Sequence, residues 1–346
     1  MTRLDQITRR QRGVVARSQV FDAGLTPAAL RHRLDSGRWQ RVFDGVYATF
    51  TGGVPPPARR WAAVLWAGHD AVLSHRSAAE EAGLADHPAG LGDHPAGLGG
   101  HADVGPTASS GGTIHITIPE RRRVRPTPGI VVHRSRQLAR RRHPTRRPPQ
   151  TRVEETVLDL ALTATSDETA MAWIAAACTR RLTTPDRVAK ALAARHRVPH
   201  RRDLAALLDD VRSGCHSVLE HRYLRHVERA HDLPTGVRQR RRPEATTTRY
   251  DDVTYTDFGV LVELDGLAAH PPELRWRDFR RDNAAAEHGE VVLRYGTSDI
   301  REHPCEVAHQ VATVLRSRGW DGVAAPCSPT CDTLLPGPTP PRPEPP

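Results

Sequence analysis

The stretch YDDVTYTDFGVLVELDG, Tyr250–Gly266, decides the fold of the C-terminal part of the chain, because two strand patterns flank one turn. A four-residue turn over Thr256–Gly259 pairs Tyr255 with Val260. Side chains alternate between the two faces of a strand, so this register sorts them by polarity. One face carries apolar side chains and the other carries acidic ones: Val253, Tyr255, Val260, Val262 and Leu264, against Asp252, Glu263 and Asp265. A shift of one residue would mix the two sets, so the pattern predicts this register.

The acidic face, Asp252, Glu263 and Asp265, needs a compensating partner. The register puts Asp252 opposite Glu263, and like charges in that position destabilise a sheet. Oxygen ligands from a few carboxylates suit Mg²⁺ or Mn²⁺, and such an ion can activate water. We therefore expect the three carboxylates to bind one of these ions. The alternative is an ordinary solvent-facing side of an antiparallel sheet.

The hairpin belongs to a longer pattern that includes SVLEHRYLRHVERAHDLP, Ser217–Pro234, and RRDNAAAEHGEVVLRY, Arg280–Tyr295. Together these segments resemble the family called domain of unknown function number 559. That family is similar to very-short-patch mismatch repair endonucleases and has the restriction-endonuclease-like fold. The resemblance covers about residues 217–320, and it implies that Glu220 approaches the acidic face.

The resemblance also implies a set of catalytic residues: Glu220, Asp252, Glu263, Asp265, His270 and Arg294. Many nucleases of this fold carry a lysine two residues after the acidic strand residue, where this chain has Asp265. Lys190, the only lysine, lies far upstream. His270 is then the candidate for proton transfer and Arg294 for phosphate charge. The alternatives are a loop histidine before two prolines and an arginine that bridges a core carboxylate.

The first fifty residues predict a small helical module followed by a hairpin. ARSQVFDAG, Ala16–Gly24, and LTPAALRHRLDSG, Leu25–Gly37, read as two helices, with Thr26 as the N-cap of the second. WQRVFDGVYATF, Trp39–Phe50, reads as two short strands around Asp44-Gly45. Helix, turn, helix and hairpin in this order are typical of a winged helix-turn-helix.

This module carries the side chains that we expect to contact DNA. The second helix would present Thr26, Arg31 and His32 to a major groove. Arg38 and Arg41, on either side of the first hairpin strand, would contact phosphates. The alternative is a small packing domain with an arginine-rich surface.

Four segments of the first half resemble the AbiEi-type antitoxin and regulator family of type IV toxin–antitoxin systems. They are GLTPAALRHRLDSGRWQRVFDGVYA, AVLSHRSAAEEAGL, IHITIPE and VEETVLDLA, beginning at Gly24, Ala71, Ile114 and Val153. The resemblance covers roughly residues 5–180 and implies a DNA-binding winged helix followed by a mixed α/β domain. It also implies DNA as a partner, together with a cognate toxin or its operator.

Composition agrees with a nucleic-acid partner without establishing one. The 346 residues carry a net charge of +10, which favours a polyanionic ligand, although a solvated basic surface is the alternative. No run approaches the ~20 apolar residues of a membrane span. We therefore expect a cytoplasmic protein with no membrane partner and no small-molecule cofactor. The five cysteines show no paired ligand spacing, and Cys327 and Cys331 lie in a Pro-rich tail, so we expect no zinc site.

The expected fold class is a multidomain α+β protein with four segments. Residues 1–53 are expected to form a winged helix-turn-helix DNA-binding domain, and residues 54–212 an AbiEi-like central α/β domain with a Gly/Pro-rich loop at 86–112. Residues 213–320 are expected to form a restriction-endonuclease-like α/β domain, and residues 321–346 a disordered Pro-rich tail.

Two functions follow from this organisation. The first is a DNA-binding protein with a Mg²⁺-dependent endonuclease domain, of bacterial toxin–antitoxin or defence type. The alternative is a non-catalytic regulator or type IV antitoxin whose C-terminal domain only binds nucleic acid or a partner. The carboxylate set favours the first and the missing lysine favours the second, while DNA and RNA stay open as targets.

Overall fold

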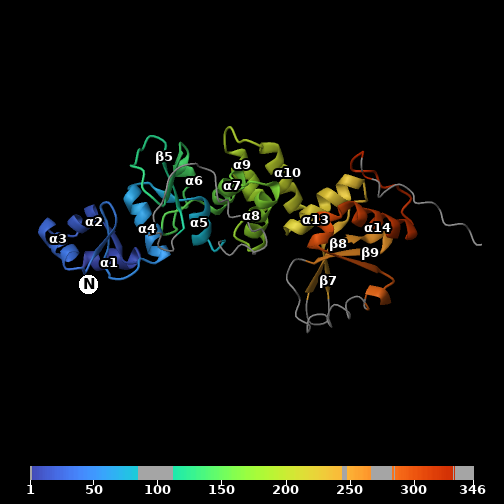
Figure 1. Ribbon diagram of the computed structural model, residues 1–346, viewed down its shortest axis with the longest axis horizontal. Coiled ribbons are helices and arrows are strands. Elements are labelled where there is room, and N and C mark those ends of the chain that lie inside the picture. Colours follow the sequence, from blue (N-terminus) through green and yellow to red (C-terminus); the bar gives the residue numbers. More distant parts are fainter. Residues whose placement is uncertain are drawn as a thin grey trace, which may run out of the picture. The chain divides into compact units, whose positions relative to one another are not determined.

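The computed structural model describes residues 2–84, 112–243, 248–265, 283, 285–329 and 331. Its backbone forms two compact units that mix helices with small sheets (Figure 1). Unit 1 comprises Met1–Thr165 and Arg180–Arg201, and unit 2 comprises Ser166–Thr179 and Arg202–Pro346. Among the described helices, none combines the length and apolar character that crossing a membrane requires.

The N-terminal module of unit 1 contains three helices and a three-stranded antiparallel sheet, in the order β1-β3-β2. In chain order its elements are α1 (Arg3–Arg10), β1 (Val14–Ala16), α2 (Arg17–Asp22), α3 (Pro27–Asp35), β2 (Gln40–Phe43) and β3 (Val46–Ala48). The expected cap is confirmed, because the Ala29 amide donates to Thr26 Oγ1 at 3.2 Å. Gly45 has φ +70° in the β2–β3 turn, which explains the glycine there.

The rest of unit 1 surrounds a second sheet, β4-β5-β6, in which β4 and β5 are antiparallel and β5 and β6 are parallel. Its elements are α4 (Pro56–Ala67), β4 (Val72–Leu73), α5 (His75–Glu81), β5 (Ile114–Pro119), β6 (Ile130–Ser135), α6 (Leu138–Arg141), α7 (Val153–Leu162) and α9 (Pro185–Ala193). Helix α4 buries an alanine-rich face against this sheet, together with Trp61. The repeated DHPAGLG segments lie outside the described residues.

Buried ion pairs hold α7 in unit 1. Glu155 accepts hydrogen bonds from Arg141 at 3.0 Å and from Arg195 at 2.6 Å. Asp159, one turn later, accepts from Arg141 at 2.5 Å. The segment VEETVLDLA therefore buries carboxylates as well as apolar side chains, each with an arginine partner.

Unit 2 is built around a four-stranded sheet of order β10-β9-β8-β7, in which only β9 and β10 are parallel among the described strands. Its helices are α8 (Asp167–Thr179), α10 (Arg201–Arg212), α11 (Val218–Arg222), η1 (Tyr223–Glu228), η2 (Arg229–His231), η3 (Thr256–Phe258), α13 (Thr297–Glu302) and α14 (Pro304–Ser317). Its strands are β7 (Val237–Pro243), β8 (Thr248–Tyr255), β9 (Val260–Asp265) and β10 (Val291–Gly296).

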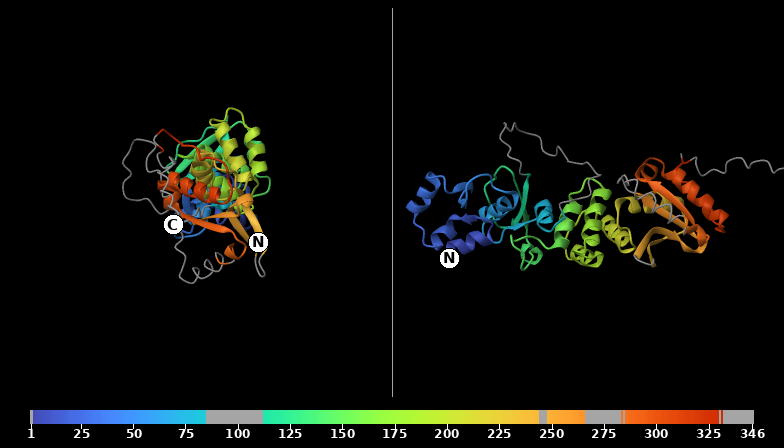
Figure 2. Two further views of the ribbon diagram at one scale, coloured as in Figure 1. Left: turned by 90° about the vertical axis from the view of Figure 1, so that its right-hand side faces the viewer. Right: turned by 90° about the horizontal axis from the view of Figure 1, so that it is seen from below.

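The predicted hairpin register is confirmed. Strands β8 and β9 pair Tyr255 with Val260 and Val253 with Val262. All four side chains are buried, and they pack against α11, η1 and α14. Helix α14 lies along the sheet (Figure 1, Figure 2). Tyr223 and Tyr255 share a buried hydrogen bond of 2.9 Å within this core.

The two compact units divide the chain differently from the expected segments. Helices α8 and α10 belong to the compact unit of the C-terminal sheet, so residues 54–212 do not form one body. Ion pairs explain this for α8, since Glu168 pairs with Arg222 and Asp167 with Arg225, both from the α11–η1 segment. Contacts also continue past residue 320, where the Pro-rich tail is expected to begin. Ala324 packs on the core of unit 2, and the Ala325 amide donates to His231 O at 2.9 Å.

Candidate functional site

The five residues expected to contact nucleic acid all lie on the surface of the N-terminal module. They are the N-cap and two middle residues of α3, a residue just before β2 and a residue within β2: Thr26, Arg31, His32, Arg38 and Arg41. Each of them is exposed. Arg41 is 63% exposed at its side chain and lies 4.0 Å from the Asp44 carboxylate, which also faces solvent.

Helix α3 packs on the module through the face that carries Leu30 and Arg33. Leu30 is buried in the small core with Trp39, and the Arg33 guanidinium lies 4.8 Å above the Trp39 ring. These contacts anchor the helix while Arg31 and His32 remain exposed. The module therefore presents guanidinium groups from two neighbouring elements, which is the chemistry that binds phosphates and base edges.

The acidic face is partly engaged within the protein. The observed β8–β9 pairing ends at Val253 and Val262, one residue before Asp252 and Glu263. The Leu264 amide donates to Asp252 Oδ2 at 2.8 Å. On the neighbouring strand β10, the Arg294 guanidinium lies 3.7 Å from Asp265 Oδ2. A backbone donor and an arginine thus offset part of the negative charge on this face.

Glu220 lies at the start of α11 and is buried. Its carboxylate accepts from the His216 amide at 3.0 Å and from Gln239 Nε2 at 3.4 Å. Because Gln239 belongs to β7, the strand next to β8, this contact ties Glu220 to the sheet that carries the acidic face. Burial raises the pKa of Glu220, and the hydrogen bond from His216 opposes that rise.

The described residues form two groups of ligand atoms compact enough for a metal, and the acidic face is in neither. In each group the atoms lie within 4.8 Å of one another: His75, His115 and His133 in unit 1, and His231, Cys305, Cys327 and Cys331 in unit 2. His270 lies outside the described residues. The binding of one Mg²⁺ or Mn²⁺ ion by Asp252, Glu263 and Asp265 therefore stays a prediction.

The three histidines of unit 1 form a stack. The rings of His75 and His133 are 3.7 Å apart, and His115 Nδ1 lies 3.1 Å from His133 Nε2. Burial lowers the pKa of His75 to about 3 and that of His115 to about 4, although Asp159 acts in the opposite direction on His75. The stack is thus neutral at physiological pH. No local pattern in the sequence reveals the stack, because His115 and His133 lie on strands far from His75 in the chain.

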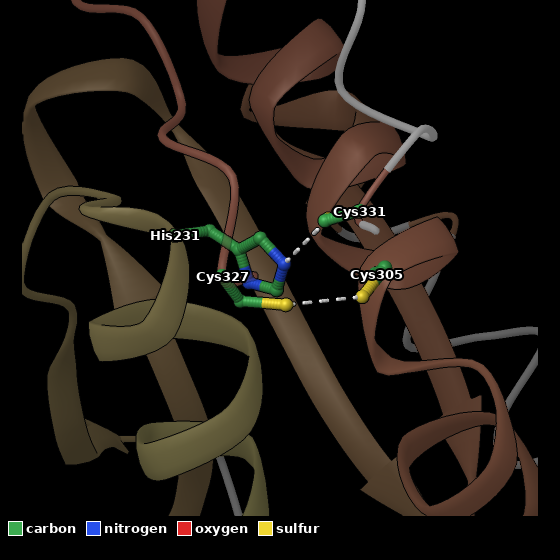
Figure 3. Close-up of side chains that lie close together, drawn as sticks. All are labelled: His231, Cys305, Cys327 and Cys331. Carbon is green, nitrogen blue, oxygen red and sulfur yellow. Dashed lines mark hydrogen bonds between the residues drawn. The ribbon is translucent and has the colours of Figure 1, made fainter. Parts of the chain in front are cut away.

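Three cysteines and one histidine form the second of these groups. The scattered cysteines predict no zinc site, yet three of them meet His231 (Figure 3). The ligands come from three separate segments, so sequence spacing does not reveal the group. The one local signal is the three-residue interval between Cys327 and Cys331, which falls within the range of zinc-binding pairs.

Comparison with known families places the exposed arginines in a recognised segment. Residues 3–49, which run from α1 through β3, match the family model described as "Transcriptional regulator, AbiEi antitoxin". A comparison with curated proteins found no match.

Proposed function

We propose that the chain is a DNA-binding transcriptional regulator of toxin–antitoxin type, and that residues 3–49 form its winged helix. The order α1, β1, α2, α3, β2, β3 supports this proposal, since α2 and α3 correspond to a helix-turn-helix and β2–β3 to the wing. In that arrangement α3 enters the major groove and the hairpin contacts the backbone.

A single observation carries the proposal. The segment that matches the regulator model also holds the exposed side chains Arg31, Arg38 and Arg41 on α3 and around β2. Packing within the module does not require exposed guanidinium groups on both elements, whereas binding of DNA phosphates does. Because the matching model is described as an antitoxin, we also propose a cognate toxin or the operator of its gene as a partner.

Binding of a labelled DNA duplex to the full chain, followed by fluorescence anisotropy at several salt concentrations, tests the proposal. The double variant Arg38→Ala/Arg41→Ala should bind more weakly. Its salt slope should fall by about two units, because each lost phosphate contact removes about one. The control is Arg316→Ala, an exposed arginine on α14 of the other unit. Equal affinity of the double variant and the wild type would contradict the proposal.

For unit 2 we propose a restriction-endonuclease-like domain that binds nucleic acid or a partner. Helix α11, then the antiparallel strands β7, β8 and β9, and then the parallel strand β10 form the order that this fold predicts. The engagement of Asp252 by Leu264 and of Asp265 by Arg294 favours a non-catalytic role.

Endonuclease activity with Mg²⁺ or Mn²⁺ is the second candidate, and the observed hairpin register favours it. In that role Asp252, Glu263 and Asp265 would hold the ion, which would supply an activated water. Nicking of supercoiled plasmid with Mg²⁺ and with EDTA tests this candidate. Activity that needs the metal and is lost in Glu263→Gln would support it. If the plasmid stays intact with Mg²⁺ and with Mn²⁺, the endonuclease candidate is contradicted and the non-catalytic binding role is favoured.

A further inference from the structure

Four side chains that can bind a metal converge in unit 2. They come from segments other than the strands of the acidic face. His231 ends η2, Cys305 is the second residue of α14, and Cys327 and Cys331 lie beyond the last helix (Figure 3). His231 and Cys331 are buried. The group thus joins three chain segments that are otherwise separate in the sequence.

The distances within the group match a tetrahedral zinc site. Sγ of Cys305 and Sγ of Cys327 are 3.5 Å apart, and Sγ of Cys331 is 3.8 Å from Nε2 of His231. Zinc with Zn–S of about 2.3 Å and Zn–N of about 2.0–2.1 Å spaces its ligands by about 3.8 Å for S···S and about 3.6 Å for S···N. A disulfide would hold two sulfurs at about 2.05 Å, and these cysteines are free.

The histidine is oriented to offer a metal its Nε2 atom. His231 Nδ1 lies 2.9 Å from Val227 O, and a carbonyl oxygen can only accept, so Nδ1 carries the proton. Nε2 therefore keeps its lone pair and points toward Cys331 (Figure 3). A backbone carbonyl that holds the remote nitrogen of a ligand histidine is a common outer-sphere feature of zinc sites.

We propose that His231, Cys305, Cys327 and Cys331 bind one structural Zn²⁺ ion. Three thiolates and one imidazole select zinc over the oxygen-preferring Mg²⁺ and Ca²⁺. Four protein ligands fill a tetrahedral zinc, so the site is closed to substrate and acts in stability. Binding releases the thiol protons to solvent and cross-links the segment after Trp320 to α14 and η2.

The cross-link explains why a Pro-rich segment stays against unit 2. Between Trp320 and Cys331, Ala324 packs on the core, and the Ala325 amide bonds to His231 O. Val323 is 77% exposed, so apolar burial contributes little at that residue. A metal that binds two cysteines of the segment would add a further attachment.

Elemental analysis of the full chain, purified without a metal-binding tag and then incubated with Zn²⁺ and desalted, tests the site. We expect about one zinc ion per chain in the wild type and in Cys178→Ser, a free cysteine of α8 outside the group. The double variant Cys327→Ser/Cys331→Ser should retain none. Wild-type protein without zinc, or with iron in its place, would overturn the proposal.

A second measurement does not depend on the variants. Wild-type protein stripped by a chelator should gain melting temperature when Zn²⁺ is added, because the ion binds the folded state. Intact mass under non-reducing conditions should show five free thiols. A loss of two hydrogens, with a peptide linking Cys305 to Cys327, would overturn the zinc site in favour of a disulfide.

Discussion

Glu220 shows how one buried carboxyl can link protein stability to pH. Burial raises its pKa above the ordinary value of 4.5, while bonds from His216, Ser217 and Gln239 oppose the shift. A carboxyl with a raised pKa binds its proton more tightly in the folded chain than in the unfolded chain. Its stabilising contribution is therefore fully present below the unfolded pKa and is lost as the pH rises through the folded pKa.

The variant Glu220→Gln should remove this pH dependence. Glutamine keeps an oxygen that accepts from the His216 amide, but it has no charge to desolvate. Above pH 4.5 the unfolding free energy of the wild type should fall relative to that of the variant, and the gap should stop growing above the folded pKa. Urea denaturation across this pH range measures the difference. Parallel curves for the two proteins would show that Glu220 does not titrate in this way.

At the residue scale, local chemistry could be predicted and long-range partners could not. Thr26 was identifiable as a cap because its partner, Ala29, is three residues away. The pairing of Glu155 with Arg195 spans forty residues, and nothing near either residue signals it. The same limit hid the meeting of Cys305 with His231, which depends on how α14 packs.

At the element scale, the β8–β9 hairpin followed from its own sequence. Alternating polarity and a short turn set the register locally, and the Tyr255–Val260 pair is as predicted. The parallel pairing of β9 with β10, which aligns Val260 with Val291, needs a long crossover. No local pattern specifies it, so the strand order of unit 2 could be anticipated only by resemblance.

The start of β7 offers a test of how tightly this sheet packs. A Cβ atom added at Gly236 would overlap Val253 Cγ1 on the neighbouring strand. Gly236→Ala should therefore destabilise unit 2 by about 1–3 kcal/mol, as overpacking of a core does. Gly53→Ala is the control, since nothing lies within 4 Å of its added Cβ. Urea midpoints that shift equally in both variants would refute this packing argument.

Across the whole molecule, the contacts of the segment after Trp320 do not follow from composition. A Pro-rich segment predicts disorder because it buries little apolar surface. Residues 321–329 nevertheless lie against unit 2, where Ala325 and His231 share a hydrogen bond. Such backbone hydrogen bonds do not depend on composition, and the proposed zinc ligands would add to them.

Two truncations test whether the segment after Trp320 adds stability. Removal of residues 321–346 should lower the melting temperature of the full chain, by about 2–4 °C for each kcal/mol of contact energy lost. Removal of residues 332–346 alone, which spares Cys331, should leave it unchanged, because that Pro-rich stretch lacks the apolar residues to build a core. Differential scanning calorimetry compares the two. Equal melting temperatures would mean that the segment after Trp320 adds no stability.

We propose the N-terminal module, and not unit 2, as the principal DNA-binding surface. Hydrogen–deuterium exchange of the full chain, with and without a bound DNA duplex, tests it most directly, because contacts slow local opening of the backbone. We predict slower exchange in the presence of DNA across residues 27–48, which hold α3 and the β2–β3 hairpin. Protection confined to residues 218–265, with unchanged exchange in α3, would contradict the claim.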